Sequence, residues 1–213
     1  MMRIVDLGIV PYRQAWEMQE QIHAAVVAGG EERILLVEHP PTITFGRRIE
    51  PANLVTPTEQ LARLGVEIVH SDRGGDVTFH GPGQLVAYPI VRLADHNLSV
   101  GGYVRLLQEA VIAALAKLGV HAGRDGSTVG VWVNDAKICA FGVRIRRGAT
   151  LHGLALNVET DLNYFNLIVP CGLTGRPVTS LKKILGPDAP TMNHARTIVS
   201  ESLLIALKGS SKA

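Results

Sequence analysis

Cys171 lies in the stretch NLIVPCGLTGRPVTSL, between a proline that follows an apolar run and a glycine that opens a turn. Pro170 fixes the incoming backbone, and Gly172 lets neighbouring amides turn toward the sulfur or toward an oxyanion beside it. A thiol held in this way could act as a nucleophile, although a lone cysteine in a Pro-Gly turn is more often structural. The residues alone leave both interpretations of Cys171 open.

A catalytic thiol also needs a nearby cation or base that favours the thiolate. Lys137 could supply that charge, because it begins a predicted strand directly after an Asn-Asp turn. The alternative is an ordinary solvated turn lysine. The other cysteine, Cys139, alternates with Ile138 and Ala140 inside the same predicted strand, which predicts that it packs as a small hydrophobic residue.

Residues 73–84, RGGDVTFHGPGQ, contain four glycines, a proline, an arginine and a histidine. Such a density is typical of a loop that turns tightly and lets another group approach the backbone closely. An ordinary connection between two strands would have the same composition. Within this loop, His80 could act as a general base or could brace the loop through a hydrogen bond.

Several other chemistries lack their motifs in this chain. The phosphate-binding pattern GxxxxGK[ST] is absent, and no GxGxxG opens a helix. The 8 histidines include no HExxH and no HxH, so we predict no metal site. No GxSxG is present, which argues against a serine hydrolase.

The elements that position these residues follow from hydrophobic periodicity. Helical spacing after Pro11 predicts a helix that ends at the glycines 29–30, and RILLVE, residues 33–38, predicts a buried strand. A second helix is predicted over 100–118, with Ser99 as its N-cap. A last helix is predicted over about 191–207.

Short β-rich runs fill the space between these helices. They are VEIVHS and QLVAYPIVR on either side of the glycine-rich loop, followed by VGVWVN, KICAFGVRI and TLHGLALNVE with turns at NDA and RRGA. Runs of adjacent strands between outlying helices predict an α+β fold with a largely antiparallel or mixed sheet.

The composition limits the class of protein. With 213 residues, 46% of them hydrophobic, the chain is expected to form one domain over 1–213. Lys+Arg number 21 against 19 Asp+Glu, without a basic run of five or more, so we predict no nucleic-acid partner. A mildly basic patch for an acidic protein stays open.

No stretch approaches the ~18 uncharged apolar residues of a membrane span. The start MMRIVDLGIV also lacks a signal peptide's basic segment and long apolar run. The 2 cysteines form no CxxC pair and no disulfide framework, which favours free thiols in a reducing compartment. We therefore expect a cytoplasmic protein with no membrane partner, and we expect a monomer.

Three blocks of the sequence, taken together, resemble the signature blocks of the lipoyl(octanoyl) transferases, in the same order. They are RGGDVTFHGPGQLVAYP, GVWVNDAKICAFGVRI and HGLALNVETDLNYFNLIVPCGL, and the similarity extends to LGIVPYRQAW and EHPPTITFGR. The resemblance covers nearly the whole chain. It implies the fold of the biotin and lipoate protein ligase catalytic domain, with a mixed, mostly antiparallel sheet flanked by helices.

The resemblance also implies an activity and its partners. The family transfers an octanoyl group from octanoyl-acyl carrier protein to a lysine of lipoyl domains, the first step in making protein-bound lipoate. The acceptors would be the E2 subunits of 2-oxoacid dehydrogenases and the glycine cleavage H protein. No cofactor is implied, and neither ATP nor magnesium is needed, since the donor thioester is already activated.

By position, the resemblance implies that Cys171 accepts the acyl group, while Lys137 lowers the pKa of that thiol and shuttles protons. The implied substrate-binding residues are Arg73, Gly74, Gly75, Asp76, Val77, Thr78, Phe79, His80, Ala140, Phe141, Gly142, Gly153, Leu154 and Ala155. Cys139 stands where the family more often has alanine, which supports its packing role. A pocket for an eight-carbon tail should be apolar, because burying each methylene is worth about 0.8 kcal/mol.

Three alternatives compete with this interpretation. An ATP-dependent lipoate or biotin ligase would share the fold, but the lipoate type has GGGAVFHDxGN in place of RGGDVTFHGPGQ and needs no PCG cysteine. A module that only binds lipoyl domains would not need both Cys171 and Lys137. A papain-like hydrolase would carry CG[SA]C[WY], which is missing here.

Overall fold

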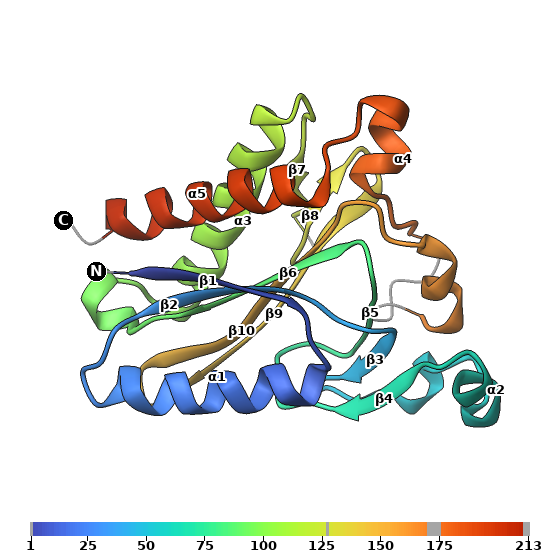
Figure 1. Ribbon diagram of the computed structural model, residues 1–213, viewed down its shortest axis with the longest axis horizontal. Coiled ribbons are helices and arrows are strands. Elements are labelled where there is room, and N and C mark those ends of the chain that lie inside the picture. Colours follow the sequence, from blue (N-terminus) through green and yellow to red (C-terminus); the bar gives the residue numbers. More distant parts are fainter. Residues whose placement is uncertain (1, 127, 170–175, 211–213) are drawn as a thin grey trace.

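A seven-stranded mixed sheet forms the centre of the computed structural model, which describes residues 2–126, 128–169 and 176–210 (Figure 1). Only the first two strands in the sheet order, β1 and β2, run parallel, and each other neighbouring pair is antiparallel. The strands, in their order across the sheet, are β1 (Arg3–Ile9), β2 (Arg33–Glu38), β6 (Gln84–Ile90), β10 (Ala149–Asn157), β9 (Ala136–Arg146), β8 (Val131–Val133) and β7 (Gly123–Arg124).

Helices cover both faces of this sheet (Figure 1). Successive side chains along a strand point to opposite faces, so a strand with apolar residues at every position needs cover on both sides. Leu35 and Val37 of β2 pack with α1 (Tyr12–Val27) on one face. Ile34 and Leu36 pack on the other face in a core that includes α3 (Val100–Lys117) and α5 (Met192–Ser210). A strand buried on both faces reads as the continuous apolar run seen in β2.

A second sheet of three short strands lies at one end of the large sheet (Figure 1). Its order is β4 (Glu67–His70), β3 (Thr42–Phe45) and β5 (Val77–His80). A separate apolar cluster holds it, with Leu61 of α2 (Thr58–Arg63) and Phe165 of the 3₁₀ segment Leu162–Leu167. The remaining elements are α4 (Leu181–Leu185) and the 3₁₀ turns Pro51–Asn53, Leu93–His96 and Gly186–Asp188.

Most of the predicted elements are confirmed. Ser99 caps α3 as expected, because its Oγ accepts a hydrogen bond of 3.0 Å from the amide of Gly102. Gly119, with a φ of +77°, follows the end of the same helix in the left-handed conformation that glycine favours. The three predicted runs after residue 129 form the meander β8, β9 and β10, and the α+β prediction with a mixed, mostly antiparallel sheet is correct.

The predicted loop over 73–84 is wrong at its centre, because Val77–His80 forms strand β5. This strand has four residues and lies between glycines, so neither its length nor its flanks indicate a strand. Its register comes from β3, where Phe45 pairs with Val77 and Thr42 pairs with His80. Strands β1 and β3 and helix α2 were also not predicted. Among the described residues, no helix is long and apolar enough to cross a membrane.

Candidate active site

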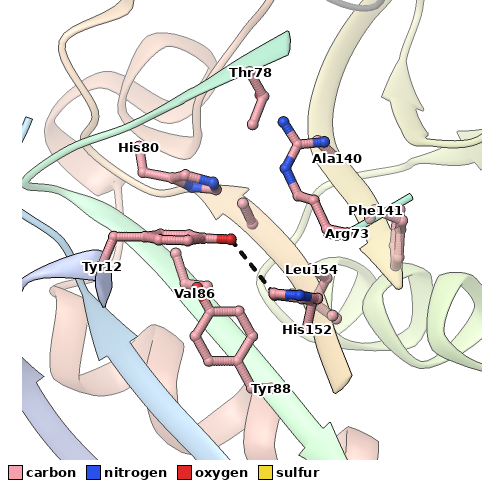
Figure 2. A pocket seen from close by; sticks show the side chains of 13 residues that line it. Tyr12, Arg73, Thr78, His80, Val86, Tyr88, Ala140, Phe141, His152 and Leu154 are labelled. Carbon is pink, nitrogen blue, oxygen red and sulfur yellow. Dashed lines mark hydrogen bonds between the residues drawn. The ribbon is translucent and has the colours of Figure 1, made fainter. Parts of the chain in front are cut away.

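A pocket, here called the inner pocket, lies where β5 and the residues before it meet the large sheet on the side of α1 (Figure 2). It encloses about 420 Å³ of empty space, including space open to solvent. Its lining is Tyr12, Arg73, Thr78, His80, Val86, Tyr88, Ala140, Phe141, Gly142, His152, Gly153, Leu154 and Ala155.

Small residues on two neighbouring strands make room for this pocket. Ala140 of β9 pairs with Ala155 of β10, and Gly142 pairs with Gly153, so the four lie on one face of the sheet. Gly153 has to be glycine, because a Cβ there would lie 2.1 Å from the carbonyl oxygen of Ala87. Ala155 also belongs to the apolar cluster under α1. The base of the pocket therefore leaves space for a ligand and is largely apolar.

A chain of polar side chains closes one side of the inner pocket, and Figure 2 shows its link between Tyr12 and His152. The Tyr12 hydroxyl lies 3.0 Å from Ser71 Oγ and 3.5 Å from His152 Nδ1. His152 Nε2 lies 2.6 Å from Asp72 Oδ1, and Arg144 forms an ion pair with the same carboxylate. His152 has a φ of +57° within β10, which is unusual for a residue other than glycine. Its contacts on both ring nitrogens fix the position of this strained residue.

Burial and Arg73 determine the electrostatics of the pocket. Burial lowers the pKa of His152 in spite of its carboxylate partner, and it lowers the pKa of His80 well below the usual value. The positive charge of Arg73 lowers both pKa values further. Burial works to raise the pKa of Asp72, but the hydrogen bond to His152 and the charge of Arg144 outweigh it, so that pKa is lowered. Both imidazoles are therefore neutral at pH 7.

Arg73 is buried, and backbone oxygens surround its guanidinium. It donates to the carbonyl oxygens of Thr44 at 2.5 Å and Asp76 at 2.7 Å, and to Thr44 Oγ1 at 3.0 Å. These bonds join β3 to the residues that lead into β5. Arg73 therefore holds the upper wall of the pocket in place and gives it a positive field.

A line of buried hydrogen bonds leads from the inner pocket toward Lys137. His80 Nδ1 lies 2.8 Å from Gln84 Oε1, and Gln84 Nε2 donates to Asn157 Oδ1 at 3.0 Å. Asn157 Nδ2 donates to the carbonyl oxygen of Thr179 at 3.0 Å, and the Thr179 amide donates to the carbonyl oxygen of Lys137 at 2.9 Å. Because Gln84 presents its oxygen, His80 carries its proton on Nδ1.

Lys137 is buried, with 8% of its surface exposed. This burial excludes the solvated turn lysine. Its backbone pairs with Val178 in a parallel bridge, and its amide donates to the carbonyl oxygen of Pro177 at 2.9 Å. Its Nζ lies 4.8 Å from the ring centroid of Trp132, and the guanidinium carbon of Arg176 lies 3.7 Å from the same centroid. The segment that begins at Arg176 therefore covers Lys137.

Lys137 borders two further spaces. One is a cavity of about 340 Å³, which shares Thr78, Ala140 and Ala155 with the inner pocket. The other is a wide depression, here called the open hollow, with about 1,490 Å³ of empty space that includes open solvent. The lining of the open hollow is Arg47, Arg48, Gly74, Gly75, Val104, Thr128, Val129, Lys137, Phe141, Gly142 and Val143. Lys137 thus lies between solvent and the inner pocket.

The structure gathers most, but not all, of the predicted site residues. Nine of them line the inner pocket: Arg73, Thr78, His80, Ala140, Phe141, Gly142, Gly153, Leu154 and Ala155. Gly74 and Gly75 line the open hollow. Cys171 lies outside the described residues.

Three of the predicted residues line none of these three spaces. Val77 and Phe79 point into the core of the small sheet, because side chains alternate along β5. Asp76 is used structurally, since its Oδ1 accepts a hydrogen bond of 3.1 Å from the Glu50 amide and its Oδ2 accepts one from Asn53 Nδ2. For these residues, the structure brings the backbone near the site but not the side chain.

Four pocket residues were not predicted: Tyr12, Val86, Tyr88 and His152. Tyr12 fits the helical periodicity after Pro11, which indicates a buried position but gives no sign of a role for its hydroxyl. His152 lies within the block HGLALN, and its position directly before a pocket glycine was the available signal. Burial of Cys139, with 1% of its surface exposed in the core beneath α3, confirms that this cysteine packs. Burial also raises the pKa of its thiol.

Comparison with known proteins places the chain in a family. The sequence matches the lipoyl protein ligase A/B catalytic domain over residues 11–203. An octanoyltransferase of Chloroflexus aggregans is 48% identical over 202 residues, covering 92% of this chain and 91% of the relative. An octanoyltransferase of Mycobacterium tuberculosis is 46% identical over 207 residues, covering 96% and 86%.

Solved structures show the same fold at low sequence identity. The crystal structure of a lipoate-protein ligase A bound with ATP has a TM-score of 0.82 at 18% identity and covers 97% of this chain and 85% of that one. The biotin protein ligase of Aquifex aeolicus has a TM-score of 0.56 at 12% identity and covers 99% and 71%. The chain therefore belongs to the lipoyl protein ligase A/B catalytic domain family and, within it, to the octanoyltransferases, which are acyltransferases.

Proposed function

We propose that this chain, acting as one catalytic domain, transfers an octanoyl group from octanoyl-acyl carrier protein to a lysine of lipoyl domains through a thioester on Cys171. The acceptors would be lipoyl domains of 2-oxoacid dehydrogenase E2 subunits and the glycine cleavage H protein. The observation that carries the proposal is the position of Lys137, which is buried between the open hollow and the spaces that lead to the inner pocket.

The first half-reaction loads the enzyme. The Cys171 thiolate attacks the donor's carbonyl carbon, a new carbon–sulfur bond forms, and the bond to the carrier's sulfur breaks. Lys137, as an ammonium, stabilises the thiolate and gives a proton to the departing carrier thiolate. Segment 177–179, which follows Cys171 by a few residues, is hydrogen-bonded to the backbone of Lys137, and this supports the pairing of the two residues.

The second half-reaction releases the product. The amine of the acceptor lysine attacks the acyl thioester, a carbon–nitrogen bond forms, and the Cys171 thiolate leaves. The proton lost by the amine passes to Lys137, which restores the ammonium for the next cycle. During both steps the octanoyl tail would occupy the inner pocket, over the small residues Ala140, Gly142, Gly153 and Ala155.

Intact-protein mass spectrometry after incubation with octanoyl-acyl carrier protein tests the proposal. We expect an octanoyl adduct that peptide mapping places on Cys171, and transfer to a lipoyl domain without added ATP. Cys171→Ser should abolish transfer, whereas the buried Cys139 can be changed to alanine with transfer retained. An adduct on Cys139, or full activity of Cys171→Ser, would contradict the thiol assignment. Strict dependence on ATP would instead favour a ligase.

A further inference from the structure

The open hollow carries charge of one sign. Its ionisable lining residues among those that the structure describes are Arg47, Arg48 and Lys137, which are all basic, and none of the described lining residues is an aspartate or a glutamate. Arg47 and Arg48 are exposed, and neither forms an ion pair with another residue of the ranges that the structure describes. Two unneutralised guanidinium groups at the rim of a depression favour an anionic ligand.

Neighbouring arginines are neutralised, which makes this pair stand out. Arg144 forms an ion pair with Asp72, Arg176 with Asp125, and Arg124 with Glu109. Of the three described basic residues that line the hollow, Arg47 and Arg48 are exposed, whereas Lys137 is buried.

The backbone beneath the arginine pair is fixed. The amides of Arg47 and Arg48 donate hydrogen bonds of 3.0 Å to the carbonyl oxygens of Arg73 and Gly75. A Cβ at Gly46 would lie 2.3 Å from the carbonyl oxygen of Gly75, so the two chain segments contact backbone to backbone. The arginine side chains therefore project from a fixed edge of the hollow, whose lining also includes Phe141 and Gly142 of the inner pocket.

We infer that Arg47 and Arg48 bind the phosphodiester of the donor's phosphopantetheine arm, so that the open hollow is the docking surface for the donor. The inference rests on the proposed acyl transfer. A carrier presents its thioester at the end of this flexible arm, and the phosphodiester is the arm's only charge. Arginine binds phosphate oxygens with paired N–H donors. The acceptor instead delivers a lysine, whose positive charge Arg47 and Arg48 would repel.

Three donors that differ in one feature at a time test this assignment: octanoyl-acyl carrier protein, octanoyl-phosphopantetheine and octanoyl-pantetheine without phosphate. The double variant Arg47→Gln, Arg48→Gln should lower kcat/KM about tenfold for the two phosphate-containing donors, mainly through KM, with less effect at high salt. It should leave kcat/KM for octanoyl-pantetheine and the KM for the lipoyl domain unchanged. The control, Arg63→Gln with Arg147→Gln, removes the same charge from exposed positions that do not line the hollow.

The outcomes separate this inference from the proposed function. An equal loss for all three donors, a loss with the carrier protein only, or a raised KM for the lipoyl domain would each overturn the assignment to the phosphodiester. Kinetics matching those of the control variant would overturn it too. If the wild-type protein transfers octanoyl from none of the three donors, the proposed function fails and the inference fails with it.

Discussion

Asn157 offers a direct test of the hydrogen-bond line between the inner pocket and Lys137. Its Oδ1 accepts from Gln84 Nε2 at 3.0 Å and its Nδ2 donates to the Thr179 carbonyl oxygen at 3.0 Å, and only 4% of the residue is exposed. Asn157→Leu keeps a similar volume but removes both bonds. It leaves the Thr179 carbonyl oxygen without this donor, whereas Gln84 Nε2 keeps its bond to the Phe79 carbonyl oxygen.

The size of the effect follows from these contacts. Two net hydrogen bonds and one buried carbonyl oxygen that loses its donor together cost about 3 kcal/mol of unfolding free energy. Because the Thr179 amide donates to the Lys137 carbonyl oxygen at 2.9 Å, we also expect the position of Lys137 to loosen. Turnover at saturating donor and acceptor should therefore fall by roughly tenfold or more.

Urea denaturation followed by circular dichroism gives the first quantity, and octanoyl transfer measured below the unfolding transition gives the second. Asn163→Leu is the matched control, since Asn163 is exposed and lies in the 3₁₀ segment Leu162–Leu167. An unfolding free energy within about 0.5 kcal/mol of wild type would refute the stabilisation assigned to the two hydrogen bonds of Asn157. A destabilised variant with wild-type turnover would refute the link to Lys137 alone.

Three further predictions follow from single contacts. Lys137→Ala should slow alkylation of Cys171 by iodoacetamide at neutral pH, and an unchanged alkylation profile would contradict this. Lys137→Arg should preserve alkylation better than turnover, because arginine keeps the charge but does not give up its proton. Gly153→Ala places a Cβ 2.1 Å from the Ala87 carbonyl oxygen and should cost about 3 kcal/mol of unfolding free energy by denaturation, while Gly101→Ala, with nothing within 4 Å, should cost none. Burial lowers the pKa of His39 in the folded protein to about 4, whereas an unfolded chain protonates its histidines near pH 6.5. The free energy of unfolding should therefore fall by about 3 kcal/mol as the pH decreases from 6.5 toward 4, and it should not change on this account above pH 6.5. His39→Gln should flatten that part of the pH profile of stability.

The large helices and the central strands could be predicted because their signals are local. The apolar spacing after Pro11 and after Ser99 repeats for several turns, and RILLVE is a continuous apolar run with charged ends. In the small sheet, β4 was predicted from VEIVHS, but β3 and β5 lack such signals, since they have four residues each and pair only with strands distant in sequence. The energy that makes Val77–His80 a strand comes from its partners and from the apolar cluster beneath it, and neither is visible in its own composition.

The family resemblance implied every residue of the run 73–80 as substrate-binding, whereas only Arg73, Thr78 and His80 of that run line the inner pocket. Alternation along β5 directs Thr78 and His80 to the inner pocket and Val77 and Phe79 away from it, but this pattern applies only once the loop is known to be a strand. Tyr12 shows a different limit. Hydrophobic periodicity correctly gives it a buried position in α1, yet periodicity says nothing about the hydroxyl that contacts Ser71 and His152.

Lys137 shows why long-range pairing decides what a local pattern leaves open. A lysine after an Asn-Asp turn is normally solvated. Trp132 contacts its ammonium from the preceding strand, but a single aromatic residue five positions away does not predict burial. The covering residues are Arg176, Pro177 and Val178, about forty positions later in the chain. In the sequence, these three residues come five to seven positions after Cys171. We therefore expect that a substitution that weakens the backbone pairing of Val178 with Lys137 impairs both the burial of this lysine and its proposed action on Cys171.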